Sequence, residues 1–259
     1  MFNPLIDKEL EEYIDILMNK PEGKIGRKYL FDRGIKKDTA IHWKMGYCPV
    51  GYVPKAYQDL INDGEFYEFW KKMWGRVVFP IYDQNGKLIS ISGRLIVKRP
   101  DKAPKYDHYS FPSRKVLFGL YQNKKNIQTE NRLIITEGQI DVITAWQSGL
   151  KNVTSSFGAH CSLDHFAIAA RYVTNLDVLY DGDQAGKVGT DAVKEFPTWG
   201  DLNVKLHLGL FPNGEDLDSW LRKNNPDKLY ELMDKSKIDN LKNRIDKIIN
   251  KRRWIKWSG

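Results

Sequence analysis

The chain has 259 residues, of which 41% are hydrophobic and 29% are charged, and its formal net charge at pH 7 is +8. A chain of this length and composition can bury the core of a soluble globular protein with one large or two small domains. Its two cysteines, Cys48 and Cys161, are far apart and in no C-x-x-C pair, which argues against a zinc ribbon or a disulfide framework and favours a reducing compartment. No signal peptide and no run of roughly 18 apolar residues is found, so we expect a cytoplasmic protein with no membrane partner.

The positive charge is concentrated in two segments of the chain. Between Lys71 and Lys125 there are 13 Lys or Arg and 3 Asp residues, and between Lys235 and Gly259 there are 9 Lys or Arg and 2 Asp residues. The remainder of the chain is therefore acidic overall. Segregated charge of this kind indicates a surface that binds a polyanion beside an acidic site. A solvated basic face is the alternative that charge alone leaves open.

The first half of the chain alternates helical and strand patterns. Residues 7–20 place Leu10, Tyr13, Ile14 and Leu17 at helical spacing, and residues 24–35 read as a short helix that ends at Gly34. Residues 75–97 contain two strand-like runs around "DQNG", which predicts a hairpin because Asn-Gly suits a positive φ. An irregular basic stretch with three prolines then precedes "VLFGLYQ".

From residue 132 onward, short apolar strands alternate with helical segments. The strands are predicted at 132–136, 152–158, 176–181 and 203–210, and the helices at 138–149, 163–172 and 184–196. Such alternation favours right-handed crossovers and a parallel sheet. In sheets of this kind, functional groups collect beyond the carboxyl ends of the strands.

Carboxylates follow three of these predicted strands. The six acids are Glu137, Asp141, Asp181, Asp183, Asp216 and Asp218. At one sheet edge they would repel one another strongly, and a divalent cation such as Mg²⁺ or Mn²⁺ would supply the missing positive charge. The sequence therefore predicts a metal site. A capping role for Asp141, and a role for Asp216 and Asp218 as helix N-terminal acids, are the alternatives.

These residues match a known family. "EGQIDV", "YDGDQAG" and "GEDLD" resemble the Toprim domain that DnaG-type DNA primases share with topoisomerases and some nucleases. Upstream, "YLFDRGI…GYCP", "GRVVFPIYDQNGKLISISGR", "PKY" and "LFGLYQ" resemble the N-terminal subdomain of the primase catalytic core, in the same order. The resemblance covers residues 20–225 and is specific to primase, since other Toprim proteins lack the upstream blocks.

The resemblance implies a mixed α/β fold in three parts. These are an α+β N-terminal basic subdomain at 1–125, a Toprim domain with a Rossmann-like parallel sheet at 126–225, and a basic helical tail at 226–259. The tail places apolar residues on one helical face, and we expect it to dock on the core, with DNA or a partner protein as alternatives. The expected apolar positions are Ile238, Leu241, Ile245 and Ile248.

The resemblance also implies an activity, which is RNA primer synthesis from ribonucleoside triphosphates on a single-stranded DNA template, with two or more Mg²⁺ or Mn²⁺ ions. Glu137, Asp181 and Asp183 match the catalytic metal-binding acids, and Glu137 could act as ligand or as general base. The other three acids match further acidic positions of the active site. The positions implied to bind nucleotide phosphates or template are Arg76, Arg94, Lys105, Arg114 and Lys115.

Two features depart from the family pattern. No zinc ribbon can be formed, and too few residues follow Lys223 for the usual helicase-binding domain. We therefore expect a bare catalytic core, as a phage genome encodes, that works with a replicative helicase and a separate zinc-binding subunit. A zinc site at His160, Cys161 and His165 is not expected, and His165 is predicted to pack or cap at a helix start. A Toprim nuclease and a non-catalytic nucleic-acid-binding subunit are the competing hypotheses.

Overall fold

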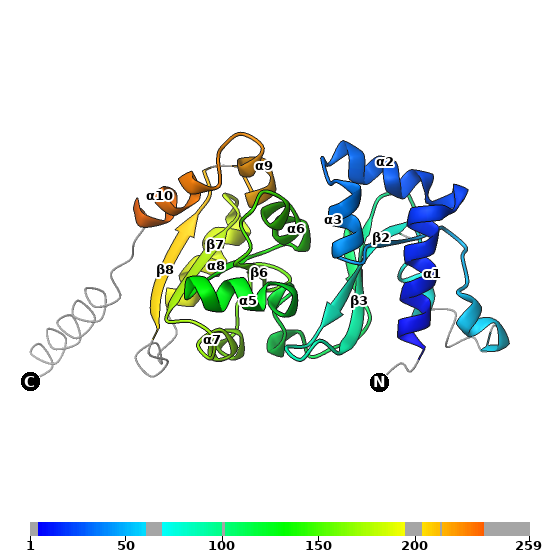
Figure 1. Cartoon of the computed structure of the whole chain (residues 1–259), viewed down its shortest axis with the longest axis horizontal. Coiled ribbons are helices and arrows are strands. Elements are labelled where there is room, and N and C mark those ends of the chain that lie inside the picture. The colour runs from blue at the N-terminus through cyan, green and yellow to red at the C-terminus, as the bar shows by residue number, and fades with distance from the viewer. Residues whose placement is uncertain (1–4, 61–68, 100–101, 195–203, 213, 236–259) are drawn as a thin grey trace, which may run out of the picture. The chain divides into compact units, whose positions relative to one another are not determined.

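The computed structural model of this chain describes residues 5–60, 69–99, 102–194, 204–212 and 214–235 (Figure 1). The chain divides into two compact units, Met1–Gln122 and Asn123–Gly259. Each unit has its own sheet and its own core, so each is described separately.

The N-terminal unit is built on an antiparallel sheet of order β1-β2-β3-β4. Helix α1 packs against β1 in this unit. The strands are β1 (Gly46–Cys48), β2 (Arg76–Tyr82), β3 (Leu88–Leu95) and β4 (Tyr106–His108), and the helices are α1 (Ile6–Asn19), η1 (Pro21–Gly23), α2 (Lys24–Asp32), α3 (Lys37–His42), η2 (Lys55–Leu60) and η3 (Ser113–Lys115). The two predicted N-terminal helices and the mixed character of this unit are confirmed.

The predicted hairpin is formed by β2 and β3, with Arg76 opposite Leu95 and Tyr82 opposite Leu88. Asp83 organises the turn, because its Oδ1 accepts hydrogen bonds from the backbone N–H groups of Asn85 (2.8 Å) and Lys87 (3.0 Å). Gly86 has φ = 89°, a conformation that glycine adopts at little cost. The local turn chemistry read from "DQNG" therefore predicts the observed connection.

A carboxyl group is buried in the core of this unit. Glu9, on α1, is fully buried and receives hydrogen bonds from the hydroxyl groups of Tyr13 (2.7 Å), Tyr57 (2.9 Å) and Tyr109. Burial raises the pKa of Glu9 to about 7, although the three tyrosine hydrogen bonds act in the opposite direction. The three donors satisfy the carboxyl oxygens, which makes burial of this polar group tolerable.

The raised pKa of Glu9 makes the stability of the protein depend on pH. The folded state holds a proton on Glu9 at pH values where the unfolded chain has released it, so stability should fall as pH rises from 4.5 to about 7. The full change corresponds to about 3 kcal/mol. Urea unfolding at pH 5 and pH 8 should show this loss in the wild-type chain and a smaller loss in Glu9→Gln.

Glu11, exposed on the same helix, provides the matched control, because Glu11→Gln should keep the wild-type pH dependence. If Glu9→Gln and the wild-type chain lost the same free energy of unfolding between pH 5 and pH 8, the buried carboxyl would not be the titrating group.

The C-terminal unit is built on a parallel sheet of order β6-β5-β7-β8 (Figure 1). The sequence predicts this parallel sheet with alternating helices, and the structure confirms it. The strands are β5 (Arg132–Thr136), β6 (Val153–Ser155), β7 (Asn175–Tyr180) and β8 (Lys205–Leu210), and the helices are α5 (Leu120–Glu130), which spans the boundary between the units, α6 (Gln139–Gln147), α7 (Leu163–Ala169), α8 (Gln184–Lys194), α9 (Leu217–Leu221) and α10 (Asp227–Lys235).

A buried ion network fastens three strands of this sheet. Asp177 on β7 is fully buried, and its carboxylate contacts Arg132 of β5 (Nη2 to Oδ1, 3.1 Å) and His207 of β8 (Nδ1 to Oδ1, 2.7 Å). The guanidinium of Arg132 also lies over the ring of Tyr230 on α10, 4.6 Å from its centroid. These contacts occupy the carboxylate of Asp177 within the sheet, which makes it a structural acid.

Two further expectations concern the C-terminal tail and membrane-spanning helices. The predicted apolar face of the C-terminal tail, with Ile238, Leu241, Ile245 and Ile248, lies outside the described residues. Within the ranges that the structure describes, no helix is both long enough and apolar enough to cross a membrane.

Candidate active site

The acids follow strands whose carboxyl ends meet at one edge of the parallel sheet (Figure 1). Glu137 comes directly after β5, and Asp181 and Asp183 come directly after β7. Asp216 and Asp218 lie on the segment that follows β8, at the start of α9. Parallel pairing of β5 with β7 and of β7 with β8 brings these three segments together.

Two glycines allow the loop after β7 to approach its neighbours closely. The Gly182 N–H donates to the carbonyl of Glu215 (2.9 Å), and a Cβ on Gly182 would lie 2.1 Å from the carbonyl oxygen of Pro212. A Cβ on Gly186 would lie 2.1 Å from the carbonyl oxygen of Asp181. No larger side chain fits at either position without a backbone shift. Gly182 therefore lets the loop of Asp181 and Asp183 approach the segment after β8, and Gly186 lets the start of α8 approach the backbone of Asp181.

Glu137 and Asp183 interact through their charges. Burial raises the pKa of Glu137, and the negative charge of Asp183 raises it further, against the opposing effects of a hydrogen bond from the Asp181 N–H (3.1 Å) and of His160. Asp183 is exposed, and its Oδ1 accepts a hydrogen bond from the Gly186 N–H (2.8 Å) at the start of α8. Among the described residues, both carboxylates accept hydrogen bonds only from backbone groups.

Asp141 and Asp218 are buried and joined to each other. The Oδ2 of Asp141 accepts from the Gly138 N–H (3.1 Å), and its Oδ1 accepts from the Asp218 N–H (3.3 Å). Burial, followed by the charges of Asp216 and Asp181, raises the pKa of Asp141 well above its ordinary value. Asp141 therefore ties α6 to α9 and lies within electrostatic range of the other acids.

Asp218 already has a positive partner within the protein. Its carboxylate contacts Arg222, one turn along the chain, at 3.0 Å and accepts a hydrogen bond from the Thr144 hydroxyl at 2.9 Å. Asp216 caps α9, since its Oδ1 accepts from the Ser219 N–H (2.7 Å). The alternative interpretation of these two acids as helix N-terminal residues is therefore correct for their local structure.

The side chains fit a divalent cation by their chemistry. Within the described part of the chain, no three Asp, Glu, His or Cys side chains are grouped closely enough to hold an ion as they stand. The negative charge of Asp183 nevertheless helps to raise the pKa of Glu137, and that of Asp181 helps to raise the pKa of Asp141. Hard carboxylate oxygens are the ligands that Mg²⁺ and Mn²⁺ prefer. Charge repulsion among oxygen donors is what a bound cation would relieve.

Arg76 has a structural position in the N-terminal unit. Its side chain is fully buried and donates hydrogen bonds to four backbone carbonyl groups. The acceptors are Lys72 (2.6 Å), Gly93 (3.1 Å), Lys105 (3.2 Å) and Pro104 (2.8 Å). The guanidinium thus joins β3 to the segments on either side of it. The phosphate contact that the resemblance implies for Arg76 stays a prediction, and in this structure its guanidinium donors serve backbone carbonyl groups.

The other predicted basic residues are accessible to solvent. Arg94 is half-buried on β3, where its guanidinium lies over the ring of Tyr106 and donates to the Tyr106 hydroxyl (3.0 Å). Lys105 is exposed and precedes β4, the strand that pairs with β3 at Arg94. Arg114 and Lys115 are exposed on η3. These four side chains can meet a phosphate without unfolding the sheet.

Sequence reasoning gave no role to three residues at the sheet edge that carries the acids. Arg222 and Thr144 bind Asp218, and His160 lies close enough to Glu137 to lower its pKa. The spacing of Asp218 and Arg222 by four residues was a usable signal, because such pairs meet on a helix. His165 caps the start of α7 through the Ser162 N–H (3.1 Å), as predicted.

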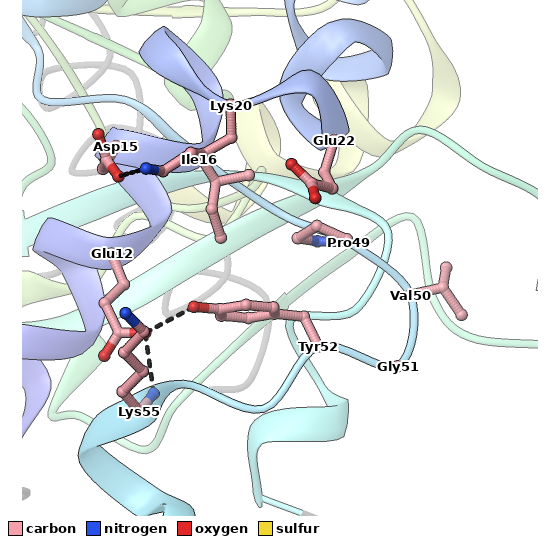
Figure 2. Close-up of a pocket in the computed structure, with 10 residues that line it drawn as sticks. All are labelled: Glu12, Asp15, Ile16, Lys20, Glu22, Pro49, Val50, Gly51, Tyr52 and Lys55. Atoms are coloured by element: carbon pink, nitrogen blue, oxygen red, sulfur yellow. Dashed lines mark hydrogen bonds and ion pairs between the residues drawn. The ribbon is translucent and has the colours of Figure 1, made fainter.

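A pocket of about 500 Å³ lies elsewhere, between α1 and the segment that follows β1 (Figure 2). Its main charged groups already have partners, since Glu12 accepts from the Tyr52 hydroxyl (2.6 Å) and the Lys55 N–H (2.8 Å), and Asp15 pairs with Lys20 (3.2 Å). None of the predicted site residues lines it. The pocket is therefore not assigned to the chemistry of the acids.

Two family models match this chain. A model described as Toprim-like matches residues 134–221, which contain all six acids. A model described as the N-terminal domain of the DNA primase catalytic core matches residues 56–124. The two matches follow one another in the order that the sequence motifs predict.

Known proteins resemble the chain over most of its length. The DNA primase of Legionella pneumophila is 30% identical over 234 residues, which are 83% of this chain and 40% of that primase. A solved DnaG catalytic core is 26% identical with a TM-score of 0.78, over 90% of this chain and 79% of that one. A DnaG primase catalytic domain bound to single-stranded DNA is 25% identical with a TM-score of 0.77, over 90% and 80%. The chain thus spans two fifths of the length of the curated relative.

Proposed function

Since this chain is a DnaG-type primase catalytic core with a Toprim domain, we propose that it synthesises RNA primers on single-stranded DNA during replication. The observation that carries the proposal is the convergence of carboxylates from three parallel strand ends in the Toprim domain of a chain that also has the primase N-terminal domain. The likeness to a primase domain bound to single-stranded DNA supports that template.

The reaction joins two ribonucleotides. The 3′-hydroxyl oxygen of one nucleotide attacks the α-phosphorus of the next, the bond between the α- and β-phosphates breaks, and pyrophosphate leaves while the hydroxyl proton is released. Because Glu137 is half-buried and its pKa is raised, its carboxylate is suited either to take this proton or to act as a metal ligand.

Primases with a Toprim domain use divalent metal ions. We assign Glu137, Asp181 and Asp183 as the residues that hold Mg²⁺ or Mn²⁺, since Glu137 and Asp183 accept only backbone hydrogen bonds within the described residues. Bound ions would supply positive charge to the attacking hydroxyl and to the phosphates. Zinc is not expected among these oxygen ligands.

The remaining acids are assigned supporting roles. Asp141 holds the N-terminus of α6 and the backbone of Asp218, and Asp218 is neutralised by Arg222. Asp216 caps α9 and contributes negative charge near Asp141. These contacts would hold the segments that carry Glu137, Asp181 and Asp183 in position. Groups that hydrogen-bond around a metal site orient its ligands in the same way.

A single assay tests the proposal. The full chain is incubated with labelled ribonucleoside triphosphates, single-stranded DNA and Mg²⁺ or Mn²⁺, and the products are sized on a gel. Short RNA that disappears when EDTA is added is the expected product. Cleaved DNA would indicate a Toprim nuclease instead, and a mobility shift without product would indicate a binding subunit. A helicase or a zinc-binding subunit can be added to the same assay as the predicted partners.

The solvent-accessible residues Arg94 and Lys105 are expected to bind the phosphates of the DNA. Lys105→Ala and Arg94→Ala should each weaken binding to single-stranded DNA, and the slope of log K against log salt should fall by about 0.7 for each phosphate that is no longer neutralised. Fluorescence anisotropy at several salt concentrations measures this slope. Lys28→Ala is the matched control, because Lys28 is exposed on α2 and pairs with Asp32 (2.7 Å). Unchanged slopes in both variants would leave these two residues as solvated surface.

A further inference from the structure

A fourth segment lies at the edge of the parallel sheet where the acids follow β5, β7 and β8. It is the loop of residues 156–161, which follows β6 at the outer side of β5. The Ser156 N–H donates to the carbonyl of Thr136 at 3.1 Å. Thr136 directly precedes Glu137, so the loop begins tied to the strand end that holds this acid.

The same loop is anchored beside the other two acids. A Cβ on Gly189 would lie 2.2 Å from the carbonyl oxygen of Ala159, so the backbone of the loop touches α8, the helix that follows Asp183. The Cys161 N–H donates to the hydroxyl of Tyr180 (3.1 Å), the residue before Asp181. The loop is therefore fastened to β5, β7 and α8, the elements that flank Glu137, Asp181 and Asp183.

The backbone of this loop is held in an unfavourable conformation. Phe157 has φ = 63°, which is uncommon for a bulky residue, and the Ser156 hydroxyl bridges this residue by donating to the carbonyl of Gly158 (2.7 Å). Such conformations persist only where the surroundings enforce them, and they cluster at functional sites. The enforced shape gives the following residues a defined position.

His160 is the exposed polar side chain of the loop at this edge. It lies between Ala159, whose carbonyl contacts α8, and Cys161, whose N–H is bonded to the residue before Asp181. The charge of His160 also acts to lower the pKa of Glu137. Within the described residues, the ring of His160 makes no hydrogen bond or ion pair. An imidazole presents at least one N–H donor whether neutral or charged, and phosphate oxygens are acceptors. The ring can thus meet a phosphate group that lies at the acids.

We propose that His160 is a substrate-binding residue, whose imidazole N–H donates a hydrogen bond to a phosphate oxygen of the ribonucleoside triphosphate held at Glu137, Asp181 and Asp183. The assignment rests on the proposed function, because that function places a triphosphate at these acids. The loop of residues 156–161 acts as a rigid wall that positions His160, and no change of conformation is needed on binding.

The test measures nucleotide binding directly, by equilibrium dialysis of the full chain with labelled ATP and Mg²⁺, and separately with labelled adenosine. His160→Ala should weaken ATP binding about ten- to a hundredfold, the loss expected for one hydrogen bond to a charged group, and should leave adenosine binding unchanged. His160→Gln, which keeps an N–H donor, should recover part of the loss. Asp164→Ala, an exposed neighbour on α7, should match the wild-type chain.

The outcomes separate this inference from the proposed function, because binding needs no catalysis. Weakened ATP binding in His160→Ala, together with a wild-type chain that makes no primer, would sink the proposed function and leave the phosphate contact standing. Unchanged ATP binding in His160→Ala, an equal loss for adenosine, or no ATP binding by the wild-type chain would overturn the assignment of His160.

Discussion

Asp183→Asn is expected to reduce primer synthesis by at least about a hundredfold, the upper end of the losses seen when a group that supports a metal site is removed. The amide side chain removes the negative charge that we assign to metal binding. It should preserve the fold, because the Oδ1 of Asp183 accepts the Gly186 N–H at the start of α8 and asparagine serves as well as aspartate in that role.

The measurement combines the primer assay with thermal unfolding in the presence and absence of Mn²⁺. Asp183→Asn should unfold at the wild-type temperature without the ion and gain less stability when the ion is added, since ligand binding stabilises the folded state by mass action. Asp191→Asn is the matched control, because Asp191 is exposed on the same helix and pairs with Lys194 (2.6 Å). Near-normal synthesis by Asp183→Asn would remove this residue from the site.

The second large effect is a loss of folding stability, which we expect when Arg76 is replaced. Arg76→Met should lower the free energy of unfolding by about 3 kcal/mol or more, because it removes a buried charged donor that serves four backbone carbonyl groups. Arg76→Lys should restore little of this loss, because an ammonium group lacks the planar fork of donors that a guanidinium presents.

Urea unfolding measures both variants, with Arg114→Met as a control on an exposed arginine, expected to change stability by no more than about 0.5 kcal/mol. A fully stable Arg76→Met that had lost nucleotide or DNA binding would contradict the structural role and restore the phosphate contact predicted from the sequence.

Local patterns explain why the architecture was predictable. The strand "RLIIT" is a short apolar run, and "DQNG" is a turn whose backbone demands are met within four residues. The helix of residues 139–147 ends before Gly149, which has φ = 96°. Each of these features depends on neighbours in sequence, so each can be read without knowing where the rest of the chain lies.

The division of roles among the acids depends on partners far apart in sequence. Asp141 receives the Asp218 N–H, and Asp218 receives the Thr144 hydroxyl from a different helix. Nothing near Asp141 in the sequence distinguishes a buried carboxyl group that accepts a backbone hydrogen bond from an exposed metal ligand. The loop of residues 156–161 was missed for the same reason, since its anchors lie on β5, β7 and α8.

By itself, the sequence determined that this chain forms a parallel sheet with carboxylates at its strand ends, because the alternation of strands and helices follows from local periodicity and right-handed crossovers make such strands parallel. Only the tertiary structure decided which charges are compensated by partners far away in sequence, as Asp177 is by Arg132, and which basic group is buried, as Arg76 is. The physical reason is that burial and ion pairing depend on distances between residues, which periodicity does not specify.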